Sequence, residues 1–146
     1  MTLMNKFKYT IPIAFAVLMF SSCGKDSEKL DEVLFGTWNV TNVEGQQYTN
    51  GNAGWNLSDN DPEGTITFNE NGWGSQDYSF TIFGSTQTFN NNFSWEANES
   101  EIRINRLNQP DMIWVRETNE NNRQIATYNI VVDADENWDY TLTLEK

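Results

Sequence analysis

The stretch Phe35-Gly36-Thr37-Trp38-Asn39-Val40-Thr41-Asn42-Val43-Glu44 decides the fold of this 146-residue chain. Its β-branched and aromatic residues are the types that strands prefer. Gly36 has no side chain, so the backbone can turn in beneath a barrel there, and Trp38 supplies a large apolar group for the barrel floor. We therefore interpret residues 35–44 as the first strand of a small β-barrel.

Beyond this strand, apolar and polar residues alternate with a period of two, which predicts half-buried strands. Further strands are predicted at 64–70, 73–83, 86–95, 101–107, 112–117, 124–132 and 138–144. Residues 45–62 are rich in Gly and Asn and are predicted to form a loop. Asn71-Gly72 is the strongest hairpin signal in the chain.

These eight short strands are evenly spaced, and no segment has the pattern of an amphipathic helix. Sequential hairpins of this kind predict an all-β fold. An eight-stranded antiparallel up-and-down barrel removes both exposed sheet edges, and its interior either fills with side chains or holds one small ligand. An open sandwich is the alternative architecture.

The segment before the first strand has the layout of an export signal. Residues 1–9 contain Lys6 and Lys8 but no acid, residues 10–20 are apolar, and small residues follow. The apolar run is shorter than the roughly 20 residues that a membrane-spanning helix needs. We predict a removable signal peptide at 1–22.

Cys23, the only cysteine, follows Ser21-Ser22 at the end of the apolar run. The stretch 18–23 resembles a bacterial lipoprotein signal, which implies that Cys23 carries fatty acyl chains (palmitate) as the first residue of the mature chain. Residues 23–33 are then an acylated polar tether, and the protein is held at the bacterial outer membrane, facing the periplasm or the cell surface. The alternative is a plain signal peptide that leaves Cys23 as a free thiol.

The charge and residue content exclude several functions. The formal net charge of −12 disfavours nucleic-acid binding. There is no His, and Cys23 is assigned to the lipid, so Ser-His and Cys-His nucleophiles are excluded. No Gly-rich phosphate loop is present. We predict a protein that is not an enzyme, with no catalytic residue and no cofactor.

Side chains at the inward phase of the strands are predicted to form the barrel floor and to line any cavity. They are Trp38, Phe68, Phe80, Phe89, Asn91, Phe93, Trp95 and Tyr140. Asn91 is the polar member, and if buried it needs a partner or a water that a cavity would supply. Trp55 and Trp73 lie in or beside Gly/Asn-rich segments, where an aromatic ring can stack on a sugar or cap a cavity mouth. The alternative is that both fold down over the barrel end.

The acidic segment near the last strand is a weak candidate for a calcium site. Asp133, Asp135, Asn137 and Asp139 place oxygen atoms at alternate positions, as calcium loops do. Trp138 stands where such a loop has its turn Gly. An Asp/Asn-rich hairpin turn explains the same residues equally well, so no metal site is assigned.

Four motifs together resemble a bacterial lipocalin-like domain of lipoproteins over residues 34–146. They are Gly36-Thr37-Trp38, Phe68-Asn69-Glu70-Asn71-Gly72, Phe93-Ser94-Trp95 and Tyr140-Thr141-Leu142-Thr143-Leu144. The resemblance implies an eight-stranded antiparallel barrel, often with a cavity for a small apolar molecule. The sequence departs from the family in two features: no helix is expected after the last strand, and no Arg is found to cover Trp38.

Two functions remain open at this stage. The first is a lipid-anchored cell-envelope barrel that binds a small apolar or amphipathic ligand. The second is a filled barrel whose loops are displayed to a protein or glycan partner. Free space inside the barrel, beside Trp38, Phe80, Phe93 and Trp95, favours the first, and normal interior packing density favours the second.

Overall fold

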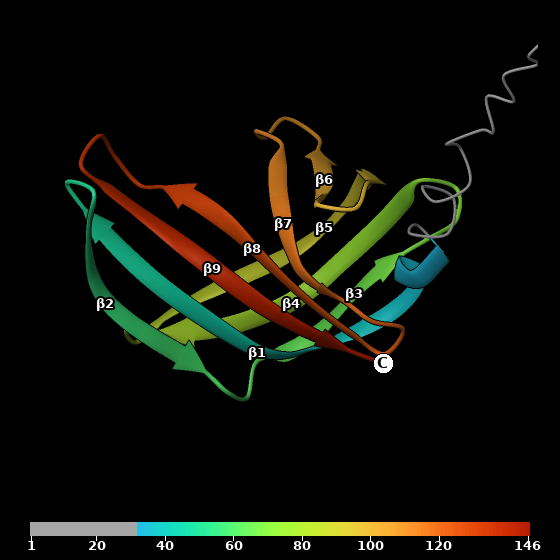
Figure 1. Ribbon diagram of the computed structural model, residues 1–146, viewed down its shortest axis with the longest axis horizontal. Helices are drawn as coiled ribbons and strands as arrows, with labels where there is room; N and C mark the ends of the chain where they lie inside the picture. The colour runs from blue at the N-terminus through green and yellow to red at the C-terminus, as the bar shows by residue number, and fades with distance from the viewer. Residues whose placement is uncertain (1–31) are drawn as a thin grey trace, which may run out of the picture.

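The computed structural model describes residues 32–146, and all strands in this part form one antiparallel sheet (Figure 1). The strands are β1 (Gly36–Thr49), β2 (Asn52–Asp59), β3 (Glu63–Phe68), β4 (Trp73–Ile82), β5 (Ser85–Ala97), β6 (Glu101–Arg106), β7 (Met112–Asn119), β8 (Arg123–Val131) and β9 (Glu136–Glu145). The predicted signal peptide, Cys23 and most of the tether lie outside the described residues. Within 32–146, no helix combines the length and the apolar character needed to cross a membrane.

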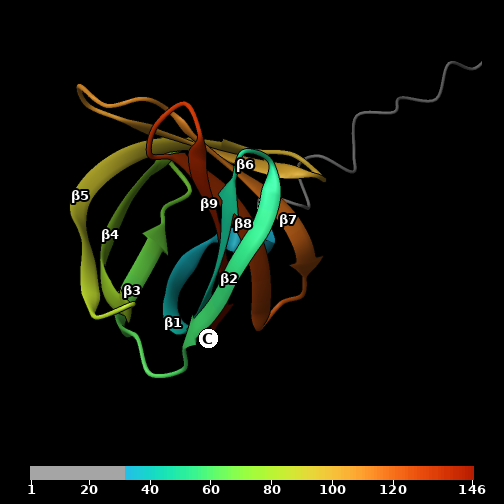
Figure 2. The same cartoon turned by 90° about the vertical axis from the view of Figure 1, so that its left-hand side faces the viewer.

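The sheet closes on itself because β1 pairs with β9 (Figure 2). On its other edge β1 pairs first with β3, from Gly36 opposite Phe68, and then with β2, up to Thr49 opposite Asn52. Strands β2 and β3 therefore share one position in the wall, and nine strands form a barrel of eight positions. The predicted eight-stranded antiparallel up-and-down barrel is confirmed.

The prediction of a loop at 45–62 was wrong. Strand β1 continues to Thr49 and β2 follows, so the structure has one strand more than predicted. Most side chains of β2 are exposed, so the segment lacks the alternation of buried apolar residues that identifies a strand. Its pairing with β1 is supported by amides: Gln46 Nε2 donates to the Trp55 carbonyl at 3.2 Å and Asn56 Nδ2 donates to Gln46 Oε1 at 3.3 Å.

Gly45 misled the prediction because it serves packing and not a turn. A Cβ at this position would lie 3.1 Å from Ile82 Cδ1 and 3.2 Å from Tyr140 Cε1. Strand β1 thus passes close to side chains of β4 and β9 inside the barrel. The other predicted strands lie within two residues of the observed bounds.

One end of the barrel is closed around Trp38, whose side chain is fully buried. A helical turn at 32–34 precedes β1 and covers this end, and the Trp38 Nε1 donates to the Leu34 carbonyl at 2.7 Å. The Lys146 ammonium lies 4.2 Å from the centre of the Trp38 ring and donates to the Phe35 carbonyl at 2.8 Å. The sequence interpretation looked for an Arg over Trp38 and missed this lysine, which provides the cation instead.

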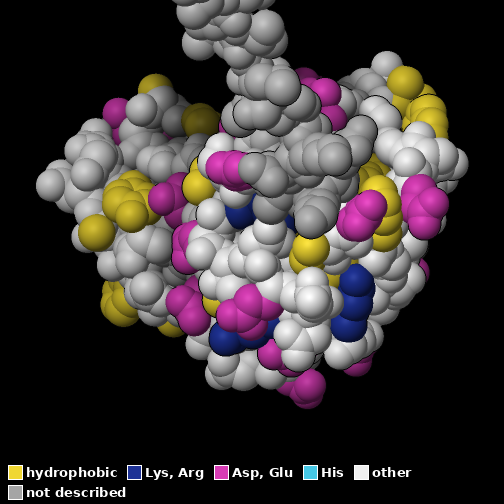
Figure 3. All heavy atoms as spheres, turned by 45° about the vertical axis from the view of Figure 1, so that its right-hand side comes forward, with side chains coloured by type: hydrophobic (Ala, Val, Ile, Leu, Met, Phe, Trp, Pro, Cys, Tyr) yellow, Lys and Arg dark blue, Asp and Glu magenta, His cyan; other side chains and the backbone are white. Residues whose placement is uncertain are grey.

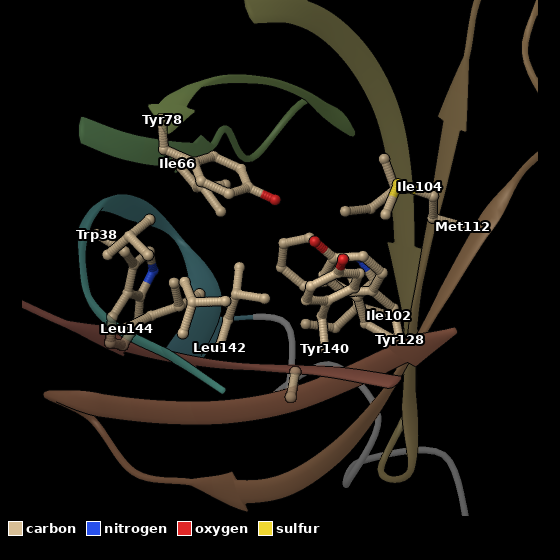
Figure 4. Packing of buried hydrophobic residues seen from close by; sticks show 14 of the residues in the cluster. Trp38, Ile66, Tyr78, Ile102, Ile104, Met112, Tyr128, Tyr140, Leu142 and Leu144 are labelled. Atoms are coloured by element: carbon tan, nitrogen blue, oxygen red, sulfur yellow. The ribbon is translucent and has the colours of Figure 1, made fainter. Parts of the chain in front are cut away.

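The core changes character along the barrel (Figure 4). Around Trp38 it consists of aliphatic side chains such as Ile66 and Leu144, both at 0% exposure. Further along, tyrosines from β4, β8 and β9 fill the interior, and the Tyr78 hydroxyl points toward the rings of Tyr128 and Tyr140. The two halves of the interior are therefore built from different chemistry.

Candidate functional site: the open end of the barrel

The end opposite Trp38 is formed by hairpin turns alone. Because successive strands alternate in direction, the turns after β1, β4, β6 and β8 gather there, and three of them lie at the left in Figure 1. Two of these turns are joined, since the Asn50 N–H donates to the Asp135 carbonyl at 2.7 Å. We call this end the mouth.

A cleft of about 370 Å³ lies at the mouth between the β4–β5 and β8–β9 hairpins. Its apolar lining consists of Ile82, Phe83, Ile130, Val132, Trp138 and Tyr140, and Ser85 and Gln87 add polar groups. Phe83 and Val132 are 53% and 57% exposed, and Tyr140, at 8%, is buried at its inner side. The cleft therefore opens to solvent and ends on a side chain of the core.

Aromatic rings form a continuous series from the rim of the mouth inward. The centre of the Trp55 ring lies 6.1 Å from that of Phe83, and Phe83 lies 5.4 Å from Trp138. Trp138 stacks on Tyr140 at 6.0 Å, and Tyr140 lies 5.6 Å from Tyr128 in the interior. Such a surface suits a flat apolar molecule.

The orientation of Trp138 is fixed by a carboxylate. Glu136 Oε1 accepts a hydrogen bond from the Trp138 Nε1 at 2.9 Å and another from Gln47 Nε2 at 2.9 Å. Burial, with a smaller contribution from the negative charge of Glu136, raises the pKa of Tyr140. The Trp138 side chain is held in this position in the wall of the cleft.

The residues predicted to line a cavity divide into two groups. Trp38, Phe68, Phe93 and Trp95 pack at the closed end, where Phe68 lies 5.7 Å from Phe93 and 5.2 Å from Trp95. None of these four lines the cleft at the mouth. They form the floor of the barrel.

The other predicted inward residues lie nearer the mouth. Tyr140 lines the cleft, Phe80 lies 5.2 Å from it, and Phe89, half-buried, stacks on Tyr78 at 4.7 Å. Asn91 is half-buried and its Oδ1 accepts a hydrogen bond from Gln76 Nε2 at 2.8 Å. The partner that Asn91 was expected to need is thus the buried side chain of Gln76.

The two loop tryptophans lie at different places. Trp55, 67% exposed, stands at the rim of the mouth beside Phe83. Trp73, 58% exposed, begins β4 at the opposite end and lines a separate cleft of about 540 Å³ with Asn92 and Ser94. Only Trp55 belongs to the mouth.

Several residues of the mouth were not singled out from the sequence. Phe83 is a bulky residue in a two-residue turn, at a positive φ of 56°, and Val131-Val132 is an apolar pair placed just before an acidic turn. Exposed apolar side chains in or beside a hairpin turn are unusual, and this was the available signal. Trp114, Tyr128 and Trp138 were also not singled out, because they lie within predicted strands.

The acidic segment 133–139 has the hydrogen bonds of a hairpin turn. Asp133 Oδ1 accepts from the backbone N–H groups of Asp135 and Glu136, both at 2.8 Å. Asp139 Oδ1 accepts from Asn129 Nδ2 at 2.7 Å. In the described part of the chain, no three Asp, Glu, His or Cys side chains are grouped so as to hold a metal ion. The turn explains these residues.

Acidic side chains elsewhere are spread over the surface among uncharged ones, as the face in Figure 3 shows. The ion pairs of the described residues, such as Arg103 Nε to Glu96 Oε1 at 3.4 Å, lie on exposed side chains. Pairs of this kind contribute little to stability. The acidity therefore defines no single charged site on that face.

Comparison with known proteins adds a similarity of shape. No protein-family model matches the sequence, and no curated protein matches it. Among solved structures, a deswapped triple mutant of a bovine odorant-binding protein superimposes with a TM-score of 0.46 and 10% sequence identity, over 78% of this chain and 74% of that chain. The barrel fold is established by the strand pairing within this chain and not by this similarity.

Proposed function

We propose that this protein is a non-enzymatic barrel that binds a small apolar or amphipathic molecule at its mouth. The observation that carries the proposal is the aromatic-lined cleft at the mouth, whose inner side is the buried ring of Tyr140. Its volume of about 370 Å³ falls within the range of roughly 300–1,000 Å³ that is usual for small-molecule sites. A ligand there would be enclosed by two hairpins.

Exposed apolar side chains around the cleft support the same function. Trp55, Phe83 and Val132 are each at least 53% exposed. Contiguous apolar patches on a protein surface are commonly functional. A ligand bound among these residues would remove their apolar area from water, at about 25 cal/mol per Å².

The backbone at Phe83 supports a role for this side chain in binding. The turn Phe83-Gly84 has φ values of 56° and 70°, a conformation in which Asn-Gly is preferred and a bulky first residue is rare. The matching turn at the mouth is Asn50-Gly51, with φ values of 51° and 75°. Phe83 therefore keeps an unfavourable backbone and an exposed ring, which is expected where the ring contacts a ligand.

We extend the proposal to the location of the protein. Residues 32–34 enter the barrel at the closed end, so a tether from an acylated Cys23 would attach there and the mouth would open away from the membrane. The proposal of a lipid-anchored protein of the bacterial outer membrane rests on the resemblance of residues 18–23 to a lipoprotein signal. The variant Cys23→Ala is expected to appear in the soluble fraction of the cells, and continued membrane retention would exclude acylation at Cys23.

Ligand binding is tested with the neutral fluorescent probe N-phenyl-1-naphthylamine. The wild-type protein is expected to enhance its emission with saturation, and Phe83→Asn to weaken its binding about tenfold, which corresponds to about 1.4 kcal/mol. Trp73→Ala is the matched control, because this exposed aromatic lies outside the cleft. No saturable binding, or equal losses in both variants, would contradict the proposal. Native mass spectrometry of protein from its own cells then identifies the co-purifying molecule.

A second candidate function, binding of a glycan, is favoured by the separate cleft beside Trp73. The exposed indole offers a face for a sugar ring, and Asn92 and Ser94 supply hydrogen-bonding groups beside it. Binding of an oligosaccharide that is lost in Trp73→Ala and kept in Phe83→Asn would support this function. Oligosaccharide binding that is kept in Trp73→Ala and lost in Phe83→Asn would exclude the cleft at Trp73 as the glycan site.

A further inference from the structure

The middle of the barrel holds buried polar atoms that the protein does not satisfy. Tyr78 on β4, Trp114 on β7 and Tyr128 on β8 are at most 2% exposed. The Tyr78 and Tyr128 hydroxyls have no hydrogen-bond partner other than each other, so one of the two O–H groups lacks an acceptor, and the Trp114 Nε1 has no partner. The Arg106 Nε on β6 is also buried and without a partner. Unpaired buried polar groups are costly and rare in native proteins, so several in one barrel require an explanation.

These four residues form one group, which we call the donor cluster. The Trp114 ring stacks on Tyr128, with centres 5.7 Å apart and planes 19° apart. The Phe89 ring contacts both tyrosines, with its centre 4.7 Å from that of Tyr78 and 6.4 Å from that of Tyr128. The Tyr78 hydroxyl points toward Tyr128 (Figure 4). Arg106 is close enough for its positive charge to lower the pKa of both hydroxyls, although burial outweighs it in each case.

The cluster offers donors more than acceptors. The N–H groups of Trp114 and Arg106 can only donate. Burial raises the pKa of Tyr78 and of Tyr128 above the usual value, so both hydroxyls keep their protons. One hydroxyl can donate to the other, and the second proton is left to donate elsewhere. The Oε1 of Gln76 is an unpartnered buried acceptor elsewhere in the interior. The group that would complete the cluster is an acceptor oxygen.

We propose that the ligand consists of a flat apolar body with an oxygen acceptor, a carbonyl or carboxylate, and that the donor cluster binds this oxygen. The inference rests on the proposed function, because it names the ligand class of the same site. Tyr140 lines the cleft and its ring lies 5.6 Å from Tyr128, so the body fits among the aromatic rings of the mouth while the head reaches inward. The charge of Arg106 favours the carboxylate.

Three probes with one body test the inference: 2-methylnaphthalene, 2-acetylnaphthalene and 2-naphthoate. Dissociation constants are measured by quenching of tryptophan fluorescence. The wild-type protein is expected to bind the ketone and the carboxylate about tenfold more tightly than the hydrocarbon, as expected for one or two hydrogen bonds. If the naphthoate binds more tightly than the ketone, the positive charge of Arg106 contributes to the affinity. If the two bind equally, the oxygen of the ligand is bound by the neutral donors.

The variants Tyr78→Phe and Tyr128→Phe remove one hydroxyl each and keep the ring. Each variant is expected to raise the dissociation constant of 2-acetylnaphthalene about three- to tenfold. The dissociation constant of 2-methylnaphthalene should stay within about twofold of the wild-type value. Tyr48→Phe, on β1 outside the cleft, is the matched control and should change neither. Thermal unfolding of each variant checks that it folds.

The outcomes separate the two proposals. If no probe binds the wild-type protein, the proposed function fails. If the three probes bind the wild-type protein equally, or if the Phe variants weaken all three probes alike, the proposed binding site at the mouth is kept. The proposal that the donor cluster binds an oxygen is then wrong. In that case the hydroxyls are satisfied by each other and by trapped water, which a ligand does not displace.

Discussion

The two ends of the barrel use the same residue types in different ways. At the closed end, the indole N–H of Trp38 donates to the Leu34 carbonyl and that of Trp95 donates to the Trp73 carbonyl. In the half toward the mouth, the indole N–H of Trp114 is equally buried and has no partner, and the buried hydroxyls of Tyr78 and Tyr128 have none beyond each other. The comparison indicates that one end is built for the stability of the fold, and that the other is completed by something outside the chain.

The largest effect is expected at the floor. Trp38→Ala removes a fully buried indole and leaves the Leu34 carbonyl without its donor, and it should cost about 3–5 kcal/mol. Urea denaturation measures this loss. Trp38→Phe, a milder variant, keeps most of the ring and should cost less. A change below about 1 kcal/mol in Trp38→Ala, a typical surface effect, would remove the distinction between the two ends.

A smaller loss of stability is expected from Gly74→Ala on β4. A Cβ at Gly74 would lie 2.5 Å from Phe93 Cε2 and 2.4 Å from the Thr67 carbonyl oxygen, so the floor would have to shift. Overpacking of this kind typically costs about 1–3 kcal/mol.

The matched control is Gly51→Ala at the mouth, where no atom lies within 4 Å of the added Cβ but φ is 75°. The expected loss of stability there comes only from placing Ala in a left-handed backbone conformation and is about 1–2 kcal/mol. Thermal unfolding compares the two variants. A larger loss in Gly51→Ala than in Gly74→Ala would contradict the picture of a rigid floor and a tolerant mouth.

Phe83→Asn is expected to change stability in the opposite direction. Asn accepts the left-handed backbone of this turn more readily than Phe, so the variant should gain about 0.5–1 kcal/mol while it loses probe binding. Chemical denaturation without ligand gives the sign. A destabilised variant would mean that the Phe83 ring serves the fold through Trp55 and Trp138.

The smallest effect is expected at Lys146. The variant Lys146→Met keeps an apolar chain and removes the cation over Trp38, together with the hydrogen bond to the Phe35 carbonyl. An exposed cation–π contact contributes about 0.5–1 kcal/mol. The loss should shrink in high salt, and thermal unfolding at two salt concentrations measures it. A loss as large as that of Trp38→Ala would show that Lys146 is part of the floor.

The sequence predicted most of the wall because a half-buried strand must alternate apolar and polar residues. It failed at β2, where exposed Asn and Gly side chains pair through amides and give no alternation. The floor residues Trp38 and Phe93 were predicted as inward and are buried. The cleft could not be predicted, because Phe83 and Val132 belong to hairpins that meet only when the sheet closes.

Both ends of the described chain, residue 32 and Lys146, reach the closed end of the barrel, as the Lys146 Nζ contact with the Val33 carbonyl at 3.3 Å shows. The rim consists only of hairpin turns, and such turns tolerate changes in sequence and length. Coupling the protein to a sensor surface through either end would therefore leave the rim unobstructed. The rim loops can also be diversified in a library without changing how the sheet closes.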